Sequence, residues 1–145
     1  MILPDINLLL YAYDSSAPVH PAAARWWQDC LSGSEPVGLA AVVVFGFVRL
    51  STNPRVYSPA ASVHDAAARV RSWLARPQVE LLQPGPRHVE TALNWLEAVG
   101  VGANLTTDAQ IAATAMEYDA TVHTTDADFA RFPGLRWVNP LLPRR

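Results

Sequence analysis

Four aspartates stand at the ends of segments whose residue types predict strands or helices. Asp5 follows a short apolar run, and Asp108 falls in the first turn of a predicted helix. Asp126 and Asp128 follow a β-branched stretch. Carboxylates gathered at one edge repel each other, which raises their pKa values unless a cation lies between them. Because the sequence has no Lys and a single Cys, a hard divalent cation such as Mg²⁺ or Mn²⁺ is the natural counter-charge. Such a cation polarises a phosphoryl oxygen and lowers the pKa of bound water.

Each of these acids also has a purely structural explanation. Asp108 alone is a first-turn carboxylate that the helix dipole stabilises by ~0.3–1 kcal/mol, and Asp126 and Asp128 alone are ordinary turn residues. Asp5 is harder to explain in this way, because a tight strand–helix junction between apolar neighbours does not call for an acid. Spacing alone therefore leaves the metal site and the structural explanation both open.

The predicted elements around the acids would bring them to one place. Residues 2–7 are expected to form a short strand that runs straight into a helix over 8–13. Thr107 and Gln110 have the spacing of a capping box, which predicts a helix start there, and a strand over 121–124 follows after a short connection. Ligands of parallel sheets bind beyond the carboxyl ends of the strands. We therefore expect Asp5, Asp108 and Asp126 to lie within reach of one cation.

The rest of the chain alternates short apolar runs with helical patterns, which predicts an α/β fold with a mainly parallel sheet. Residues 41–50 are apolar on nearly every side, and the Ser-Thr-Asn-Pro stop after them favours a helix. In the helix expected to begin at Ser62 or Asp65, Val63, Ala67, Val70 and Leu74 are predicted to face inward. The remaining expected elements are helices over 18–31 and 87–99 and strands over 37–39, 79–82 and 135–138.

Composition excludes several classes of protein. At 145 residues the chain suits one domain, residues 1–145. The net charge of −2 argues against binding nucleic acid by bulk charge. Receiver domains, haloacid-dehalogenase-like phosphatases and P-loop NTPases all need a Lys that is absent here. No segment has the length of a membrane span and the first residues do not resemble a signal peptide, so a cytoplasmic protein without membrane partners is expected.

Two motifs resemble those of PIN domains, and specifically of VapC-type toxin ribonucleases from type II toxin–antitoxin systems. Residues 5–12, DINLLLYA, are similar to the opening pattern D-x-N-x-L-x-Y-A. Residues 107–113, TDAQIAA, and 122–129, VHTTDADF, are similar to the closing patterns T-D-x-x-I-A-A and V-T-x-D-x-D-F. Two motifs in register at opposite ends of the chain are far more specific than either alone.

This resemblance implies a PIN-like three-layer sandwich and a Mg²⁺-dependent endoribonuclease, with Mn²⁺ as the alternative metal. It implies that Asp5, Asp108 and Asp126 are the catalytic, metal-binding residues, with Asp128 at the edge of the metal. Asn7 and Thr125 would orient these carboxylates. A metal-activated water would attack the RNA phosphodiester. The resemblance also implies a homodimer that a VapB-type antitoxin neutralises.

The chain departs from the family in the helix after the second strand, where PIN domains carry a Glu. Residues 38–50 contain no acid, Gly46 or Phe47 occupies the expected place, and Glu35 lies before the strand. This departure supports the alternative of a catalytically weakened PIN-fold binding protein. A PIN-like DNA nuclease is a further alternative, although the chain has no room for the helical arch of flap-type nucleases.

The segment 49–55, RLSTNPR, resembles that of a VapC subgroup with a TNPR motif. The guanidinium groups of Arg49 and Arg55 would suit a scissile or flanking phosphate, and with Asn53 they form the expected substrate-binding set. The competing explanation is a plain helix stop followed by a solvated arginine. Elsewhere, the adjacent Trp26 and Trp27 cannot both face one core, so one of them is expected either at a subunit contact or in a helix buried on two sides.

Overall fold

The computed structural model describes residues 1–143, which form six α-helices, one 3₁₀ helix and one five-stranded sheet. The strands are β1 (Ile2–Pro4), β2 (Val37–Ala40), β3 (Val79–Leu82), β4 (Thr121–His123) and β5 (Trp137–Val138). The helices are α1 (Ile6–Tyr13), α2 (His20–Ser32), α3 (Ala41–Ser51), α4 (Val63–Leu74), α5 (His88–Val99), α6 (Leu105–Glu117) and the 3₁₀ helix η1 (Ala127–Arg131).

The sheet has the strand order β3-β2-β1-β4-β5, and every pairing in it is parallel. The central strand β1 pairs with β2 on one side and β4 on the other, and Pro4 stands beside His123. The carboxyl ends of β1 and β4 are therefore neighbours. The strand order reverses between them, which is where open parallel sheets place their ligands.

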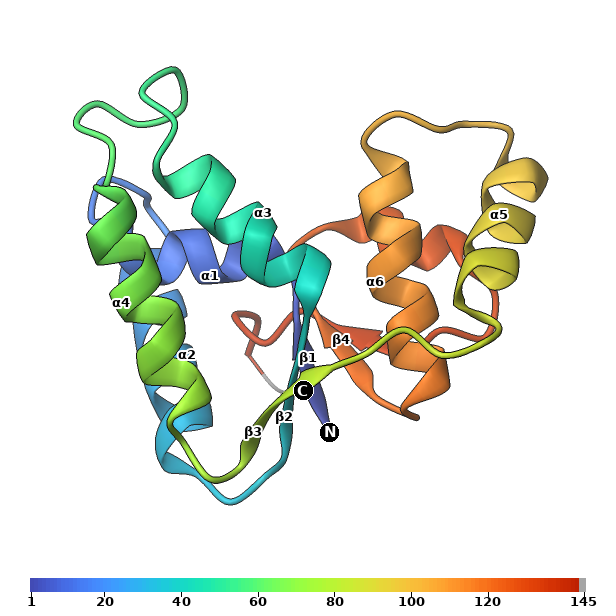
Figure 1. The fold of residues 1–145 in the computed structure, drawn as a ribbon, viewed down its shortest axis with the longest axis horizontal. Helices are drawn as coiled ribbons and strands as arrows, with labels where there is room; N and C mark the ends of the chain where they lie inside the picture. The colour runs from blue at the N-terminus through green and yellow to red at the C-terminus, as the bar shows by residue number, and fades with distance from the viewer. Residues whose placement is uncertain (144–145) are drawn as a thin grey trace.

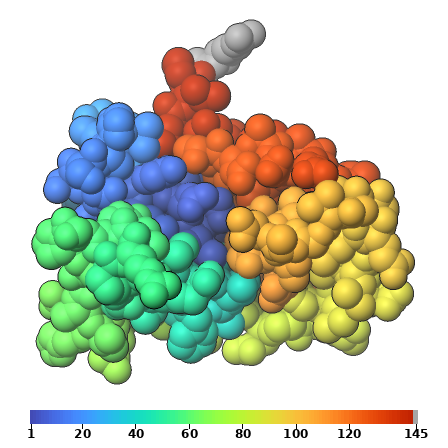
Figure 2. Space-filling view, turned by 90° about the horizontal axis from the view of Figure 1, so that it is seen from above, coloured from blue at the N-terminus to red at the C-terminus, as the bar shows by residue number. Residues whose placement is uncertain are grey.

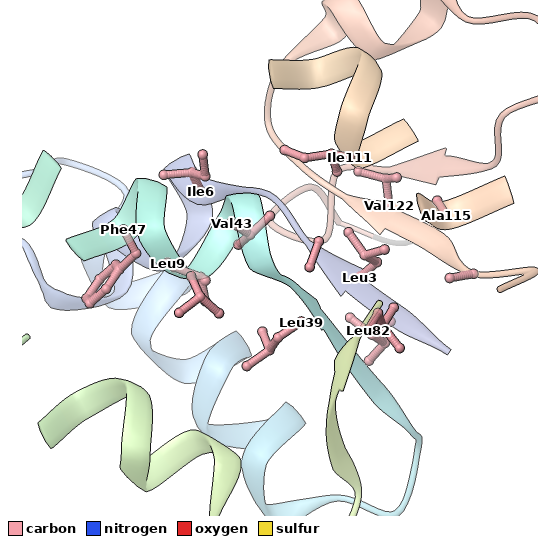
Figure 3. Packing of buried hydrophobic residues seen from close by; sticks show 14 of the residues in the cluster. Leu3, Ile6, Leu9, Leu39, Val43, Phe47, Leu82, Ile111, Ala115 and Val122 are labelled. Carbon is pink, nitrogen blue, oxygen red and sulfur yellow. The ribbon is translucent and has the colours of Figure 1, made fainter. Parts of the chain in front are cut away.

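Helices cover both faces of the sheet, as a parallel sheet requires. Figure 1 shows α1 to α4 on one side of the strands and α5 and α6 on the other, so the fold has three layers. In the core, Leu9, Val43 and Phe47 fill the first side, and Ile111 and Val122 fill the second (Figure 3). The expected α/β sandwich is confirmed, and its sheet is wholly parallel.

Three local expectations are wrong. The first strand is shorter than expected, because β1 ends at Pro4 and α1 already begins at Ile6. Helix α6 begins at Leu105 with Asn104 as its N-cap and no side-chain cap, so Thr107 lies inside the first turn and forms no capping box. The inward face of α4 is only partly as predicted: Val70 is buried as expected, but Val63 is 67% exposed, and Trp73, which was not predicted to face inward, is buried. Trp73 is buried because its ring packs against Phe47 at 4.8 Å between centroids and its Nε1 donates to the Tyr13 hydroxyl at 2.7 Å.

The two adjacent tryptophans of α2 both pack against other residues of this chain. Trp27 is buried and meets Trp73 edge to face at 5.5 Å. Trp26 is half-buried, stacks on the His123 ring at 5.8 Å and donates to its Nδ1 at 3.2 Å. Most of α2 is nevertheless exposed or half-buried, with a single buried stripe, so the expected burial on two sides is wrong, and Trp26 itself gives no reason for a subunit contact. Among residues 1–143, no helix is long and apolar enough to cross a membrane.

Candidate active site

Asp5 is fixed at the junction of β1 and α1. Its backbone N–H donates to the His123 carbonyl at 2.9 Å, which extends the pairing of β1 with β4. Its carboxylate caps α1, because Oδ1 accepts from the Ile6 N–H at 2.6 Å. The other oxygen, Oδ2, accepts from the Thr124 hydroxyl at 2.9 Å. Asp5 is only 4% exposed, so this acid is buried and held by three separate hydrogen bonds.

Thr124 joins the two ends of the chain at this point. Its hydroxyl donates to Asp5 and accepts from the Asp126 N–H at 2.9 Å. The Asp126 carboxylate in turn caps η1, with Oδ1 accepting from the Asp128 N–H at 2.8 Å. A continuous hydrogen-bonded path therefore runs from Asp5 through Thr124 and Asp126 to Asp128.

This orienting role was expected of Asn7 and Thr125. Thr124 makes these contacts instead, while Thr125 is half-buried and the Asn7 side chain is exposed. The backbone of Asn7 still acts on Asp5, because its N–H helps to lower the pKa of that carboxyl. Strand alternation places Thr124 on the same side of the strand as Val122, and this was the available signal for its inward direction.

Asp108 reaches the same neighbourhood from α6, on the other face of the sheet. Its pKa is raised from 3.8 to about 7, chiefly by burial and then by the charges of Asp5, Asp126 and Asp128 in that order. Burial also raises the pKa of Asp5, against the lowering effect of the Thr124 hydroxyl and the Ile6 N–H, and Asp126 adds to the rise. All four predicted acids are thus close enough to act on one another electrostatically.

The acids do not form a ready-made metal site. Within residues 1–143, no group of three His, Cys, Asp or Glu side chains is arranged to hold a metal ion, and the expected convergence of the acids on one cation stays a prediction. Asp5 and Asp126 are turned toward their own backbone and Thr124, although each carboxylate oxygen keeps a second lone pair. In chemical type the set fits a hard divalent cation, because all its members are oxygen ligands, and a cation would offset the burial and the neighbouring charges that raise the pKa of Asp5 and Asp108.

The position of the missing Glu is occupied by an apolar side chain. Gly46 is buried in α3, and a Cβ there would overlap the Ile6 side chain. Ile6 follows Asp5 directly, so the space beside the acid is filled. Glu35 cannot replace the missing Glu, because it precedes β2 at the end of the sheet where Val37 stands beside Ile2, opposite the edge that carries Asp5.

The expected substrate-binding residues surround the end of α3. Arg49 lies in its last turn and Arg55 in the following loop, both are exposed, and neither makes an ion pair within residues 1–143. Asn53 has a clear structural role: its Oδ1 accepts from the Arg55 N–H at 2.9 Å, and its carbonyl accepts from the next two N–H groups. The structure thus explains Asn53 as the residue that shapes the loop.

Comparisons with known proteins agree with this arrangement. The family profile of the PIN domain matches residues 2–135. Ribonuclease VapC33 of Mycobacterium tuberculosis is 49% identical over 141 residues, covering 97% of this chain and 99% of the relative. Ribonuclease VapC37 of the same organism is 39% identical over 140 residues, with 97% of each chain covered.

Solved structures show the same fold. The structure of Mycobacterium tuberculosis VapC20, described as a Sarcin-Ricin loop cleaving toxin, aligns with a TM-score of 0.69 at 19% identity over 94% of this chain and 99% of that chain. VapBC2 from Rickettsia felis, bound to a DNA fragment from its promoter, aligns with a TM-score of 0.68 at 17% identity over 95% and 98% of the two chains.

Proposed function

The chain belongs to the PIN-domain family and within it to the VapC ribonucleases, and on this premise we propose that it is a metal-dependent endoribonuclease toxin. The observation that carries the proposal is the path Asp5–Thr124–Asp126–Asp128 at the carboxyl edge of the sheet, with Asp108 electrostatically coupled to it. These are the acids that the motifs single out, and they come from opposite ends of the sequence.

The proposed metal is Mg²⁺, with Mn²⁺ as the alternative, held by Asp5, Asp108 and Asp126 with Asp128 at its edge. When bound, such an ion stabilises charge on the phosphoryl group and activates a water. The chain supplies the positioning: Thr124 fixes the Asp5 carboxylate and the Asp126 backbone relative to each other. Asp108, with a pKa of about 7, can take up or release a proton near neutral pH when no metal is present.

The substrate is RNA, and Arg49 and Arg55 are proposed to contact its phosphates through exposed guanidinium groups. The test is cleavage of RNA by the purified protein with Mg²⁺ and with EDTA, with 5′-end mapping of the products. Asp5→Asn, which keeps the shape of the side chain, is expected to abolish metal-dependent cleavage. Unchanged cleavage by this variant would disprove the proposed site.

A catalytically weakened binding protein is the second candidate, and the filled position at Gly46 favours it. The two candidates differ in one measurement, since only an enzyme shows Mg²⁺-stimulated RNA cleavage that depends on Asp5. A DNA nuclease is distinguished by offering single-stranded DNA of the same sequence, which the proposed enzyme leaves intact.

The proposed partner is a VapB-type antitoxin, supported by the VapBC complexes among the similar structures, and the proposed compartment is the cytoplasm, where RNA is found. A homodimer is proposed as well, supported by exposed apolar side chains on α3 and α5: Phe45 is 70% exposed and Val89 66%. Sedimentation of the purified chain at micromolar concentration tests the dimer, and a monomer would contradict it.

A further inference from the structure

A second polar site lies at the far end of α1 from the acids. Here a cavity of about 520 Å³ opens between the end of α1, the end of α3 and the loop that joins α3 to α4. Its size is that of a small-ligand pocket. Hydroxyl groups dominate its lining, which includes Tyr13, Ser16, Ser51, Tyr57 and Ser58. The wall also carries one cation, Arg69, and one carboxylate, Asp14.

The Arg69 guanidinium is held in place and keeps its charge available. It lies 4.7 Å from the centroid of the Tyr13 ring, and the Tyr13 hydroxyl is itself fixed by accepting from Trp73 Nε1 at 2.7 Å. Within residues 1–143 Arg69 makes no ion pair with a carboxylate. The nearby acid, Asp14, is occupied by Ser16, whose N–H and hydroxyl donate to its Oδ1 at 3.0 and 2.6 Å.

Tyr57 brings an aromatic ring to the same wall. It comes from the loop that Asn53 shapes, since its N–H donates to the Asn53 carbonyl at 3.0 Å. Burial raises the pKa of the Tyr57 hydroxyl, and Asp14 and Tyr11 raise it further, so the hydroxyl keeps its proton and remains a hydrogen-bond donor. A guanidinium, a tyrosine ring and several hydroxyls form the chemistry that recognises an unstacked nucleotide of RNA.

Helix α1 connects this cavity with the acids. Asp5 is its N-cap and Asp14 its C-cap, and at ~1.5 Å per residue the helix is about 12 Å long. That length equals roughly three to four stacked nucleotides at ~3.4 Å each. Asn7, Tyr11 and Asp14 follow one another at helical spacing, and none of the three is fully buried. In Figure 2 the N-terminal part of the chain, in blue, lies between the green segment and the orange one.

We infer that the cavity at the end of α1 is a subsite for one nucleotide of the RNA substrate, several nucleotides from the bond that is cut. The inference rests on the proposed function for the identity of the ligand. The base stacks against Tyr57 or the Arg69 plane, the guanidinium contacts a phosphate, and the hydroxyls of the wall bind the ribose or the base edge.

The first test measures binding without cleavage. Fluorescence anisotropy with labelled RNA octamers in EDTA compares wild type with Arg69→Gln and Tyr57→Ala. Each variant is expected to bind about tenfold more weakly, because loss of one stacked base contact has this order of effect. Arg71→Gln is the matched control, since it removes the same charge from an exposed position on the same helix outside the cavity, and it should bind like wild type. Thermal melts establish that each variant is folded.

The second test uses cleavage to separate this inference from the proposed function. With Mg²⁺, Arg69→Gln should raise KM for an octamer without changing kcat and leave a trinucleotide substrate unaffected. RNA cleavage that is identical in wild type and both variants for both lengths would overturn the subsite and leave the function standing. Octamer binding that depends on Arg69 and Tyr57, in a wild type that cuts no RNA, would support the subsite and refute the function. If the variants still bind RNA but no longer bind the antitoxin, the cavity is a binding site for the protein partner and the inference is wrong.

Discussion

Replacing Asp108 by Asn should stabilise the metal-free protein at alkaline pH while removing metal-dependent cleavage. The side chain lies in a cluster of like charges, with Asp5, Asp126 and Asp128 all acting on it. The amide has nearly the same shape as the carboxyl group and carries no charge. The substitution therefore removes the cost of burying a charge and, to a smaller extent, the repulsion from the neighbouring acids, and it leaves the packing of α6 intact.

The size of the gain follows from the pKa of Asp108. In the folded chain that pKa is about 7, against 3.8 for the free side chain, and a gap of this size corresponds to roughly 4 kcal/mol at ~1.36 kcal/mol per pH unit. Solvent screening of this partly exposed group reduces the figure to about 2 kcal/mol. For a chain of this length such a change raises Tm by roughly 6–8 °C.

The pH dependence has a defined sign. Because folding raises the pKa of Asp108, its contribution to stability is fully present below pH 3.8 and is lost as the pH rises through about 7. The variant should therefore melt at the same temperature as wild type near pH 4 and well above it at pH 8. Adding Mg²⁺ at pH 8 should raise the Tm of wild type and leave the variant nearly unchanged.

Asp65→Asn is the matched control, because Asp65 also lies in the first turn of a helix but outside this cluster. It loses only the favourable dipole interaction, so its Tm should fall slightly, by the equivalent of ~0.3–1 kcal/mol. Melting curves over pH 4 to 8, with and without Mg²⁺, provide the measurement. A gain for Asp108→Asn that is equal at pH 4 and pH 8, or no gain at all, would refute the electrostatic reasoning.

Three other outcomes are expected. Thr124→Val should lower the free energy of unfolding, measured in urea, by about 1–3 kcal/mol, because two partners lose their hydrogen bond. It should also reduce the rate of RNA cleavage about 10–100-fold. Thr124→Ser keeps the hydroxyl and should retain most of the stability and of the cleavage rate. Gly46→Glu should destabilise the fold by about 1–3 kcal/mol through overlap with Ile6, and should not provide a fourth metal ligand. Adding Ile6→Ala should relieve part of this loss of stability. A Gly46→Glu variant that cleaves RNA faster than wild type would contradict the packing explanation. EDTA should stop RNA cleavage and lower Tm at pH 8, and cleavage that persists in EDTA would show that the acids work without a metal.

Much of the fold is predictable because its signals are local. The β-branched run before Asp126 forms β4, and the apolar segment before the Ser-Thr-Asn-Pro stop forms α3. Errors arose where tertiary packing overrode a local signal. The capping-box spacing of Thr107 was overridden because α6 starts at Leu105, which is buried, and α4 buries Trp73 where the apolar pattern favoured Val63.

The sequence identifies the acids of the candidate site, but not the hydrogen bonds and packing contacts around them. Motif spacing identifies Asp5, Asp108 and Asp126, because acids at strand and helix ends are visible in the sequence. The role of Thr124 was missed because its bond to Asp5 joins residues 119 positions apart; strand alternation indicates that Thr124 faces inward, but not which residue it meets. The filled position at Gly46 was also hidden, because it depends on the direction of the Ile6 side chain from another helix.

The bond between Thr124 and Asp5 also sets the order in which the site is completed during synthesis. Its two residues are 119 positions apart in the sequence, and the strand that carries Asp5 lacks its β4 neighbour until residues 121–123 emerge. At ~5–20 residues per second, about 6–25 s pass between synthesis of Asp5 and of Asp128. Throughout that interval the nascent chain holds a partial sheet and an incomplete acidic edge. A chain with this topology therefore completes its acidic edge only after β4 has been made and has paired with β1.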